Sequence, residues 1–274
     1  MACRVAFQGE RGAYSEMAVL QYFLKADPVP HKSFHDVFEA VEKKKVDFAV
    51  VPVENSIEGS VGEVYDLLLQ TKMSAVGEVY QRVRHCLIAN QGVEIKDIKS
   101  AYSHPQALGQ CRNYLQEKNI DPVAAYDTAG SVKIIKEKKL MDSAAIASKR
   151  AAELYGMQIL DEGIEDRKSN YTRFLVLCPR AKAAGKGSYK TSIIFSIKHE
   201  PGALFAILGE FAASNLNLTK IESRPTKETP WEYNFYVDFE GHAKDRTVSS
   251  VIKKIKAKTS YFRLLGSYKK AEFQ

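Results

Sequence analysis

Polar residues follow or precede apolar, strand-like runs at several places in the first two thirds of the sequence. Residues 54–56 (Glu-Asn-Ser) come directly after the apolar run 46–53, and residues 103–106 (Ser-His-Pro-Gln) open a helix-like segment. Residues 127–130 (Asp-Thr-Ala-Gly) open another, and residues 170–173 (Asn-Tyr-Thr-Arg) introduce the last apolar run of this part. Because ligands bind at the carboxyl ends of strands in open α/β sheets, these segments predict a ligand-binding cleft.

The residue types in these segments suit hydrogen bonding to an anion. Helix N-termini that face one cleft would supply backbone N–H groups to such a ligand. Helix capping is the structural alternative for two of the segments, by Ser103 or His104 and by Asp127 or Thr128, whereas a cap at Ser60 explains only part of the segment at 54–56. Spacing alone therefore predicts only a small anionic ligand in an α/β cleft. Arg173 is either a carboxylate ligand or one half of a surface ion pair.

Cysteine and histidine spacing gives no metal-binding or disulfide pattern. The four cysteines are widely separated, with no Cys-x-x-Cys pair: Cys3, Cys86, Cys111 and Cys178. This usage predicts a reducing compartment, which we take to be the cytoplasm. The glycine pair Gly9 and Gly12 has neither the dinucleotide-binding nor the phosphate-loop spacing. We therefore expect no metal and no other cofactor.

The elements that must position the polar segments change character near residue 180. Up to residue 178, strand-like runs alternate with helix-like runs, which predicts an α/β architecture. Residues 179–189 are small, polar and glycine-rich and predict a linker. Residues 190–274 follow the order strand, helix, strand, strand, helix, strand, which is typical of the ferredoxin-like βαββαβ unit.

The net charge of +7 belongs to the C-terminal third of the 274 residues. Residues 180–274 carry 17 Lys and Arg against 9 Asp and Glu, whereas residues 1–179 carry 23 against 24. The run 253–258 (Lys-Lys-Ile-Lys-Ala-Lys) has the pattern of a solvated helix face, so we expect no nucleic-acid partner. No run approaches the ~20 apolar residues that cross a bilayer, and the start has no apolar signal segment, so we expect no membrane association.

Four motifs together resemble the prephenate dehydratase family: Pro52-Val53-Glu54-Asn55-Ser56, Ser103-His104-Pro105-Gln106-Ala107-Leu108, Asp127-Thr128-Ala129-Gly130 and Thr172-Arg173-Phe174. Residues 201–204 (Pro-Gly-Ala-Leu) and 222–225 (Glu-Ser-Arg-Pro) resemble motifs of an ACT regulatory domain. The resemblance implies a two-lobed catalytic domain like that of periplasmic binding proteins, followed by the ACT domain. Its lobes would be residues 1–78 with 158–178, and residues 79–157.

The implied activity is the conversion of prephenate to phenylpyruvate with loss of CO2 and water. By resemblance, Thr172 is the donor to the leaving hydroxyl, and Ser103 and Gln110 orient the ring. The implied catalytic residues are Thr172, Ser103, Gln110, Asn55 and Glu54, and the implied substrate-binding residues are Ser15, Thr128, Ala129, Arg173 and Phe174. Whether Arg173 holds a substrate carboxylate or braces the fold stays open.

The ACT resemblance implies control by L-phenylalanine, the end product of the pathway. Such domains commonly bind an amino acid at the interface of a pair, which implies a homodimer or homotetramer. The implied effector-binding residues are Gly202, Ala203, Leu204, Asn217, Leu218, Glu222 and Ser223. The N-terminus of a helix at Gly202 suits a carboxylate.

The first motif departs from the family pattern. The family has Gly-Pro-x-Gly-Thr-Phe-Ser, whereas this chain has Gly-Glu-Arg-Gly-Ala-Tyr-Ser at residues 9–15, with Ser15 kept. Substrate choice is therefore open between prephenate and the related arogenate, whose side chain carries an amino group. A non-enzymatic alternative is an amino-acid sensor with an inactive cleft.

Overall fold

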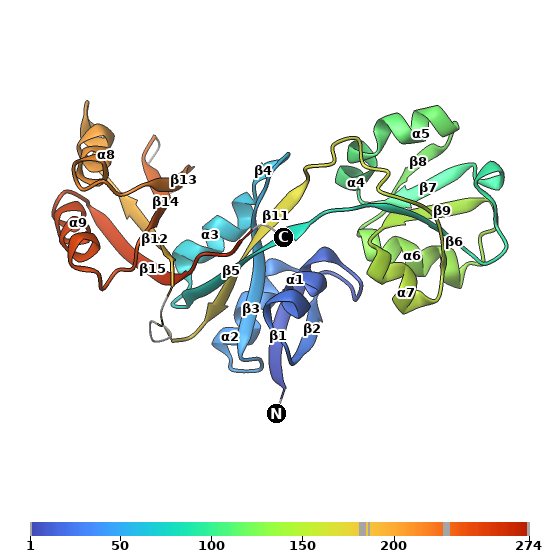
Figure 1. The fold of residues 1–274 in the computed structure, drawn as a ribbon, viewed down its shortest axis with the longest axis horizontal. Coiled ribbons are helices and arrows are strands. Elements are labelled where there is room, and N and C mark those ends of the chain that lie inside the picture. The colour runs from blue at the N-terminus through green and yellow to red at the C-terminus, as the bar shows by residue number, and fades with distance from the viewer. Residues whose placement is uncertain (1, 181–184, 186, 227–230, 273–274) are drawn as a thin grey trace.

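The computed structural model describes residues 2–180, 185, 187–226 and 231–272, and these residues form three β-sheets. Figure 1 shows the sheets in a row along the long axis of the molecule, with the N-terminal sheet in the middle. The C-terminal sheet and the second sheet along the chain therefore lie on opposite sides of it.

The middle sheet combines the N-terminal strands with a strand that comes after the second sheet in the sequence. Its elements are β1 (Cys3–Gln8), α1 (Tyr14–Tyr22), β2 (Ala26–His31), α2 (Phe34–Glu42), β3 (Phe48–Asn55), β4 (Gly59–Ser60), α3 (Gly62–Gln70), β5 (Ser74–Arg82) and β11 (Tyr171–Cys178). The strand order is β2-β1-β3-β11-β5, with β4 paired to β3. β1 is parallel to β2 and β3, whereas β11 is antiparallel to β3 and β5. β3 is central, which explains its apolar sequence.

The second sheet has the order β10-β6-β9-β7-β8. Its elements are β6 (Cys86–Ala89), β7 (Ser100–Ser103), α4 (Pro105–Gln110), α5 (Arg112–Lys118), β8 (Asp121–Ala124), α6 (Thr128–Glu137), β9 (Ser143–Ala147), α7 (Lys149–Tyr155) and β10 (Gln158–Glu162), with a short 3₁₀ helix at Ile95–Asp97. Helices α6 and α7 pack together with β6 and β9 around one apolar cluster.

The structure differs from the predicted lobe boundaries at two strands. β10 was expected in the first lobe with residues 158–178, but it pairs with β6 in the second sheet. β5 continues to Arg82 in the middle sheet, where Arg82 lies opposite Tyr171 of β11. The residues of β10 are only partly buried because it is an edge strand, and the sequence therefore lacks a strong apolar signal there. Residues 83–85 and 163–170 are the two connections between the lobes.

The third sheet has the predicted βαββαβ order. Its elements are β12 (Tyr189–Ser196), α8 (Ala203–Ala213), β13 (Leu218–Pro225), β14 (Tyr233–Glu240), α9 (Arg246–Ala257) and β15 (Tyr261–Lys269). Its strands are all antiparallel, in the order β13-β14-β12-β15. The lysine run lies on α9, whose Val248, Val251 and Ile255 are buried, as expected for an amphipathic helix. Of the predicted linker 179–189, residues 181–184 and 186 lie outside the described part.

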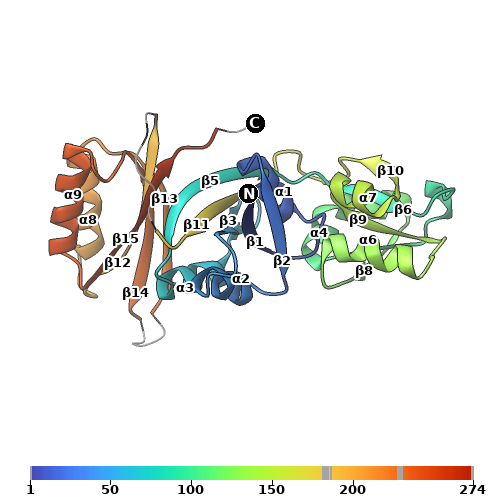
Figure 2. The ribbon, with the colours of Figure 1, turned by 90° about the horizontal axis from the view of Figure 1, so that it is seen from below.

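One face of the third sheet packs directly on the middle sheet. Figure 2 shows α8 and α9 on the outer face, leaving the inner face toward the middle sheet. Ile194, Tyr236 and Tyr268 from this inner face share an apolar cluster with Leu175 of β11. A Cβ on Gly266 would lie 2.1 Å from the Ala75 carbonyl oxygen, so only glycine fits this contact.

Within the described residues, no helix has the length and apolar character needed to span a membrane.

Candidate active site

A cavity of about 390 Å³ lies between the middle sheet and the second sheet. Its lining includes residues at one edge of the middle sheet: Gln8 at the end of β1, Asn55 at the end of β3, and Thr172 at the start of antiparallel β11. The opposite side is lined by His85 of the connection between the lobes and by residues of the second lobe: His104, Gln106, Ala107, Gln110, Tyr126, Asp127 and Thr128. The cleft therefore lies where the strand-end argument placed it.

Asn55 fixes the Thr172 hydroxyl at the floor of this cleft. The two residues are paired across β3 and β11, and Asn55 Nδ2 donates to Thr172 Oγ1 at 3.0 Å. Asn55 Oδ1 accepts from the backbone N–H groups of Ile57 and Glu58 at 2.9 and 3.0 Å. Since a backbone N–H can only donate, the orientation of the Asn55 amide is determined.

Gln110 links the two lobes through its side-chain amide. Its Oε1 accepts from Asn170 Nδ2 at 2.9 Å and lies 3.0 Å from His85 Nε2. Its Nε2 donates to Glu58 Oε1 at 3.3 Å. Asn170 in turn accepts from Asn55 Nδ2 at 2.8 Å. A continuous chain of side-chain hydrogen bonds therefore runs from Thr172 to His85.

Burial shifts the pKa values of His85 and Tyr14, which lie at the end of this chain. Burial is the main cause that lowers the pKa of His85, opposed by the hydrogen bond with Gln110 and by Glu165. Burial also raises the pKa of the neighbouring Tyr14 hydroxyl well above its ordinary value. Both side chains are therefore neutral near pH 7.

Four helices of nine or more residues begin at the cleft. Tyr14 and Phe34 are the first residues of α1 and α2, Val61 is the N-cap of α3, and Thr128 is the first residue of α6. Among the described residues, no side chain caps the first turn of α1 or α3. Their N–H groups, together with the positive ends of the helix dipoles, favour a negatively charged ligand.

The cleft brings together Asn55, Gln110 and Thr172 of the predicted catalytic residues, and Ser15 and Thr128 of the predicted binding residues. Sequence reasoning did not assign Tyr14, His85 or Asn170. Tyr14 lies within the first motif, residues 9–15, and Asn170 within the polar segment 170–173, which was the available signal, but His85 lies outside every motif.

Three predicted residues lie in the core instead of the cleft. Ser103 has no exposed surface, and its hydroxyl donates to the Ile146 carbonyl oxygen at 2.6 Å, so it does not face a substrate ring. Ala129 and Phe174 each pack in an apolar cluster. Ser103 and Ala129 are the chain neighbours of the cleft residues His104 and Thr128, and Phe174 lies two residues beyond Thr172.

Glu54 and Arg173 point to the face of the middle sheet that the third sheet covers. Side chains alternate along a strand, so the neighbours of Asn55 and Thr172 face away from the cleft. Arg173 donates to Glu78 at 2.8 Å and to Asp238 at 2.6 Å. Arg173 therefore lies in the contact with the third sheet and not in the lining of the cleft, as the bracing role would require.

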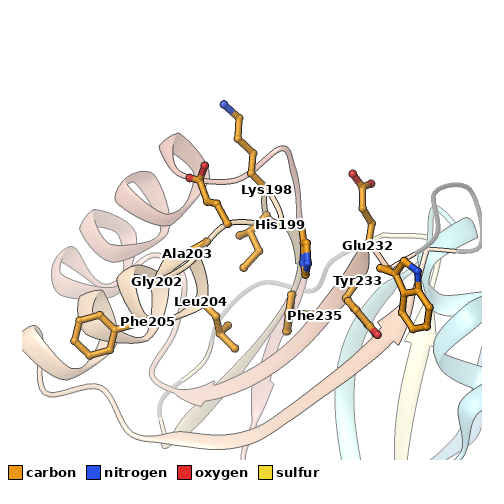
Figure 3. Close-up of a pocket in the computed structure, with 12 residues that line it drawn as sticks. Lys198, His199, Gly202, Ala203, Leu204, Phe205, Glu232, Tyr233 and Phe235 are labelled. Atoms are coloured by element: carbon orange, nitrogen blue, oxygen red, sulfur yellow. The ribbon is translucent and has the colours of Figure 1, made fainter.

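The predicted effector residues are divided in the same way. Gly202, Ala203 and Leu204 line a cavity of about 370 Å³ at the start of α8, where Figure 3 shows them across from Glu232, Tyr233 and Phe235. The other four do not line it: Asn217, Leu218, Glu222 and Ser223. All four lie at or along edge strand β13, and Glu222 accepts a hydrogen bond from Ser60 of the catalytic part at 2.6 Å.

The described residues contain no group of three His, Cys, Asp or Glu side chains arranged to hold a metal ion. Hydroxyl, amide and imidazole side chains, the Asp127 carboxylate and backbone N–H groups are what this cleft offers a substrate.

Comparison with known families decides which chemistry this cleft serves. Residues 5–182 match the prephenate dehydratase family, and residues 191–257 match the ACT domain. The chain belongs to the prephenate dehydratase family. It is therefore a dehydratase with an ACT domain, and the predicted family and fold class are confirmed.

Relatives of this dehydratase cover nearly the whole chain. Arogenate dehydratase/prephenate dehydratase 2, chloroplastic, from Arabidopsis thaliana is 45% identical over 97% of this chain and 72% of its own length. The structure of prephenate dehydratase in complex with L-Phe from Arthrobacter aurescens has a TM-score of 0.90 and 33% identity, covering 98% of this chain and 90% of that one. A structure named "GqqA- a novel type of quorum quenching acylases" has a TM-score of 0.91 and 32% identity, covering 98% of both chains.

Proposed function

We propose that this chain converts prephenate to phenylpyruvate in L-phenylalanine biosynthesis. The observation that carries the proposal is the oriented Thr172 hydroxyl in a cleft at which four helices begin. The reaction breaks the ring C–O bond and the bond to the ring carboxylate, whose electron pair aromatises the ring. It consumes one proton and releases CO2 and water, so the protein has to deliver a proton to the leaving hydroxyl.

Thr172 is placed to deliver that proton. Asn55 Nδ2–H occupies a lone pair of Thr172 Oγ1, which leaves the Thr172 O–H able to donate to a hydroxyl in the cleft. A threonine is a weak acid, so it acts by a hydrogen bond that strengthens as the C–O bond breaks, or by relaying a proton. The N–H groups at the starts of α1 and α3 would hold the carboxylates of the dianionic substrate.

An acylase reaction has less support from the cleft. Hydrolysis of an amide by a serine or threonine needs a base next to the hydroxyl. In the described part of the cleft, the His85 ring contacts Tyr14 and Gln110 and is not paired with Ser15 or Thr172. The dehydration therefore remains the better proposal for this chain.

Arogenate is a second candidate substrate, and Asp127 is the observation that favours it. Asp127 is the one carboxylate among the described residues that line the cleft, and an ammonium group would interact well with it. Its Oδ1 accepts from Gly130 N–H at 2.9 Å as the cap of α6, which leaves Oδ2 for a ligand.

The variant Asp127→Asn separates the two substrates. Asparagine caps a helix as well as aspartate does, so the fold is kept while the charge is lost. If Asp127 recognises the ammonium group, kcat/KM for arogenate falls about tenfold more than kcat/KM for prephenate, the expected size of one charged contact. Steady-state kinetics of both substrates measure this ratio. An equal change for both substrates would remove Asp127 from substrate choice.

We also propose L-phenylalanine as the feedback effector, bound at the start of α8. Its carboxylate would accept from the N–H groups there, and Gly202, at φ +81°, is the N-cap. Asn217 and Leu218 lie outside that cavity within one chain, so we propose that a second copy supplies them in a homodimer or homotetramer. The absence of a cysteine pair supports a cytoplasmic location as a further proposal.

A further inference from the structure

His85 lies in the wall of the cleft just before β6, and the proposed chemistry does not use it. Its side chain is buried, with Nε2 3.0 Å from Gln110 Oε1 and Nδ1 3.2 Å from the Tyr14 hydroxyl. Its backbone N–H donates to Glu165 Oε2 at 2.9 Å. The main chain at His85 is therefore fixed independently of what the ring does.

The direction of every hydrogen bond between Thr172 and Gln110 follows from two backbone donors. The N–H groups of residues 57–58 determine which amide atom of Asn55 is Oδ1. Asn55 Nδ2 then faces both Thr172 Oγ1 and Asn170 Oδ1. Asn170 is left with Nδ2 toward Gln110, so the Gln110 atom at 2.9 Å from it must be the acceptor Oε1.

These hydrogen-bond directions determine the tautomer of His85. Gln110 Oε1 has no proton, so the His85 Nε2 that faces it must carry one. Because the ring is neutral, Nδ1 is then the unprotonated nitrogen, and it faces the Tyr14 hydroxyl. The Tyr14 hydroxyl has one proton, which it donates to the Arg84 carbonyl oxygen at 2.7 Å, so its 3.2 Å contact with the unprotonated Nδ1 is a secondary one.

We propose that His85 is a positioning residue for the dehydration, acting through the chain Gln110, Asn170 and Asn55 on the Thr172 hydroxyl. Its Nε2–H donates to Gln110 Oε1, the oxygen that also accepts from Asn170 Nδ2, and so holds the Gln110 end of the chain in place. The inference rests on the proposed function, since it concerns a residue that assists the same reaction.

The variants His85→Leu and His85→Gln test the donor role. Leucine removes the donor, and kcat for prephenate falls about tenfold with KM within about twofold, since the group acts on the reacting donor and not on substrate binding. Glutamine places an N–H near Nε2 and restores kcat to within about threefold of the original chain. A matched control is Asn90→Leu, which removes bonds to the Ile135 and Leu140 carbonyl oxygens in the same lobe but leaves kcat unchanged.

A double-mutant cycle with Thr172→Val separates positioning from a general effect on the fold. If His85 acts through the Thr172 hydroxyl, adding His85→Leu to Thr172→Val lowers kcat by less than about twofold more. Losses that multiply would overturn the proposal. An unchanged kcat in His85→Leu would also overturn it, as would a tenfold loss of kcat in His85→Gln. The glutamine variant tests the proposal even where the leucine variant does not fold.

The unmodified chain is assayed first, so that failure of the proposed function can be told apart from failure of the role of His85. Absence of prephenate turnover would contradict the proposed function. Turnover by the unmodified chain with full kcat in the folded His85→Leu variant would contradict only the role of His85. ¹⁵N NMR of the histidine ring gives an independent result: the Nε2–H tautomer at neutral pH is expected, and the Nδ1–H tautomer would overturn the proposal.

Discussion

Replacing Thr172 by valine lowers kcat for prephenate by about 10²-fold, the lower end of the range for a positioned proton donor. Valine keeps the shape of threonine but removes the hydroxyl that Asn55 orients. KM changes little, because the strands that carry the site are unaffected and Asn55 Nδ2 keeps its bond to Asn170. Steady-state kinetics of phenylpyruvate formation measure both constants.

Thr172→Ser is the matched control for this experiment. Serine keeps the hydroxyl and loses only a methyl group, so its kcat is expected within about tenfold of the unmodified chain. A valine variant that is folded and turns over at the unmodified rate would show that the proton reaches the leaving hydroxyl by another route.

Replacing Arg173 by methionine destabilises the protein by about 3 kcal/mol, the lower end of the cost of breaking a buried ion pair. Arg173 Nε lies 2.8 Å from Glu78, whose side chain has no exposed surface, and Nη1 lies 2.6 Å from Asp238. Lys190 also pairs with Glu78 at 3.0 Å, so the carboxylate keeps one partner after the substitution. The shift of the urea unfolding transition measures the loss.

Two further variants make the Arg173 result specific. Adding Asp238→Asn to Arg173→Met removes the carboxylate whose cation was Arg173 and recovers part of the lost stability. Arg4→Met is the control, because Arg4 is half exposed and its pair with Asp27 at 3.8 Å contributes about 1 kcal/mol or less. If Arg173→Met unfolds at the same urea concentration as Arg4→Met, the buried cluster does not hold the third sheet in place.

Catalysis and regulation meet on the two faces of β3 and β11. Asn55 and Thr172 face the cleft, whereas their neighbours Glu54 and Arg173 face the third sheet. Lys220 of β13 lies 3.0 Å from Glu54, so the edge strand of the ACT domain contacts the residue next to Asn55. Each residue that contacts the ACT domain, Glu54 on β3 and Arg173 on β11, is therefore directly followed or preceded by a cleft residue. A structural change in the ACT domain can reach the cleft through one step of the backbone.

Sequence patterns predicted the order of most elements and the three residues that meet on the cleft floor and wall, but not which face of a strand each motif residue occupies. The motif Thr172-Arg173-Phe174 includes a cleft residue, a residue in the contact with the third sheet and a core residue. Alternation predicts that neighbours diverge. Which neighbour faces the cleft depends on where the third sheet packs, and that is a long-range property of the fold.

The sequence did not predict β2 or the contacts of His85, and the reasons differ. β2 contains Pro28 and Pro30 and pairs only with β1, so as an edge strand it lacks the usual strand signal. His85 contacts Tyr14 and Gln110, which lie 71 and 25 residues away in the sequence. A lone histidine before a short apolar strand carries no sign of those contacts.

The most direct test of the account is product analysis of the purified chain incubated with prephenate. The account predicts phenylpyruvate and CO2 in equal amounts, at a rate that L-phenylalanine lowers. Failure to convert either prephenate or arogenate, together with hydrolysis of an acyl amide by the same protein, would contradict it.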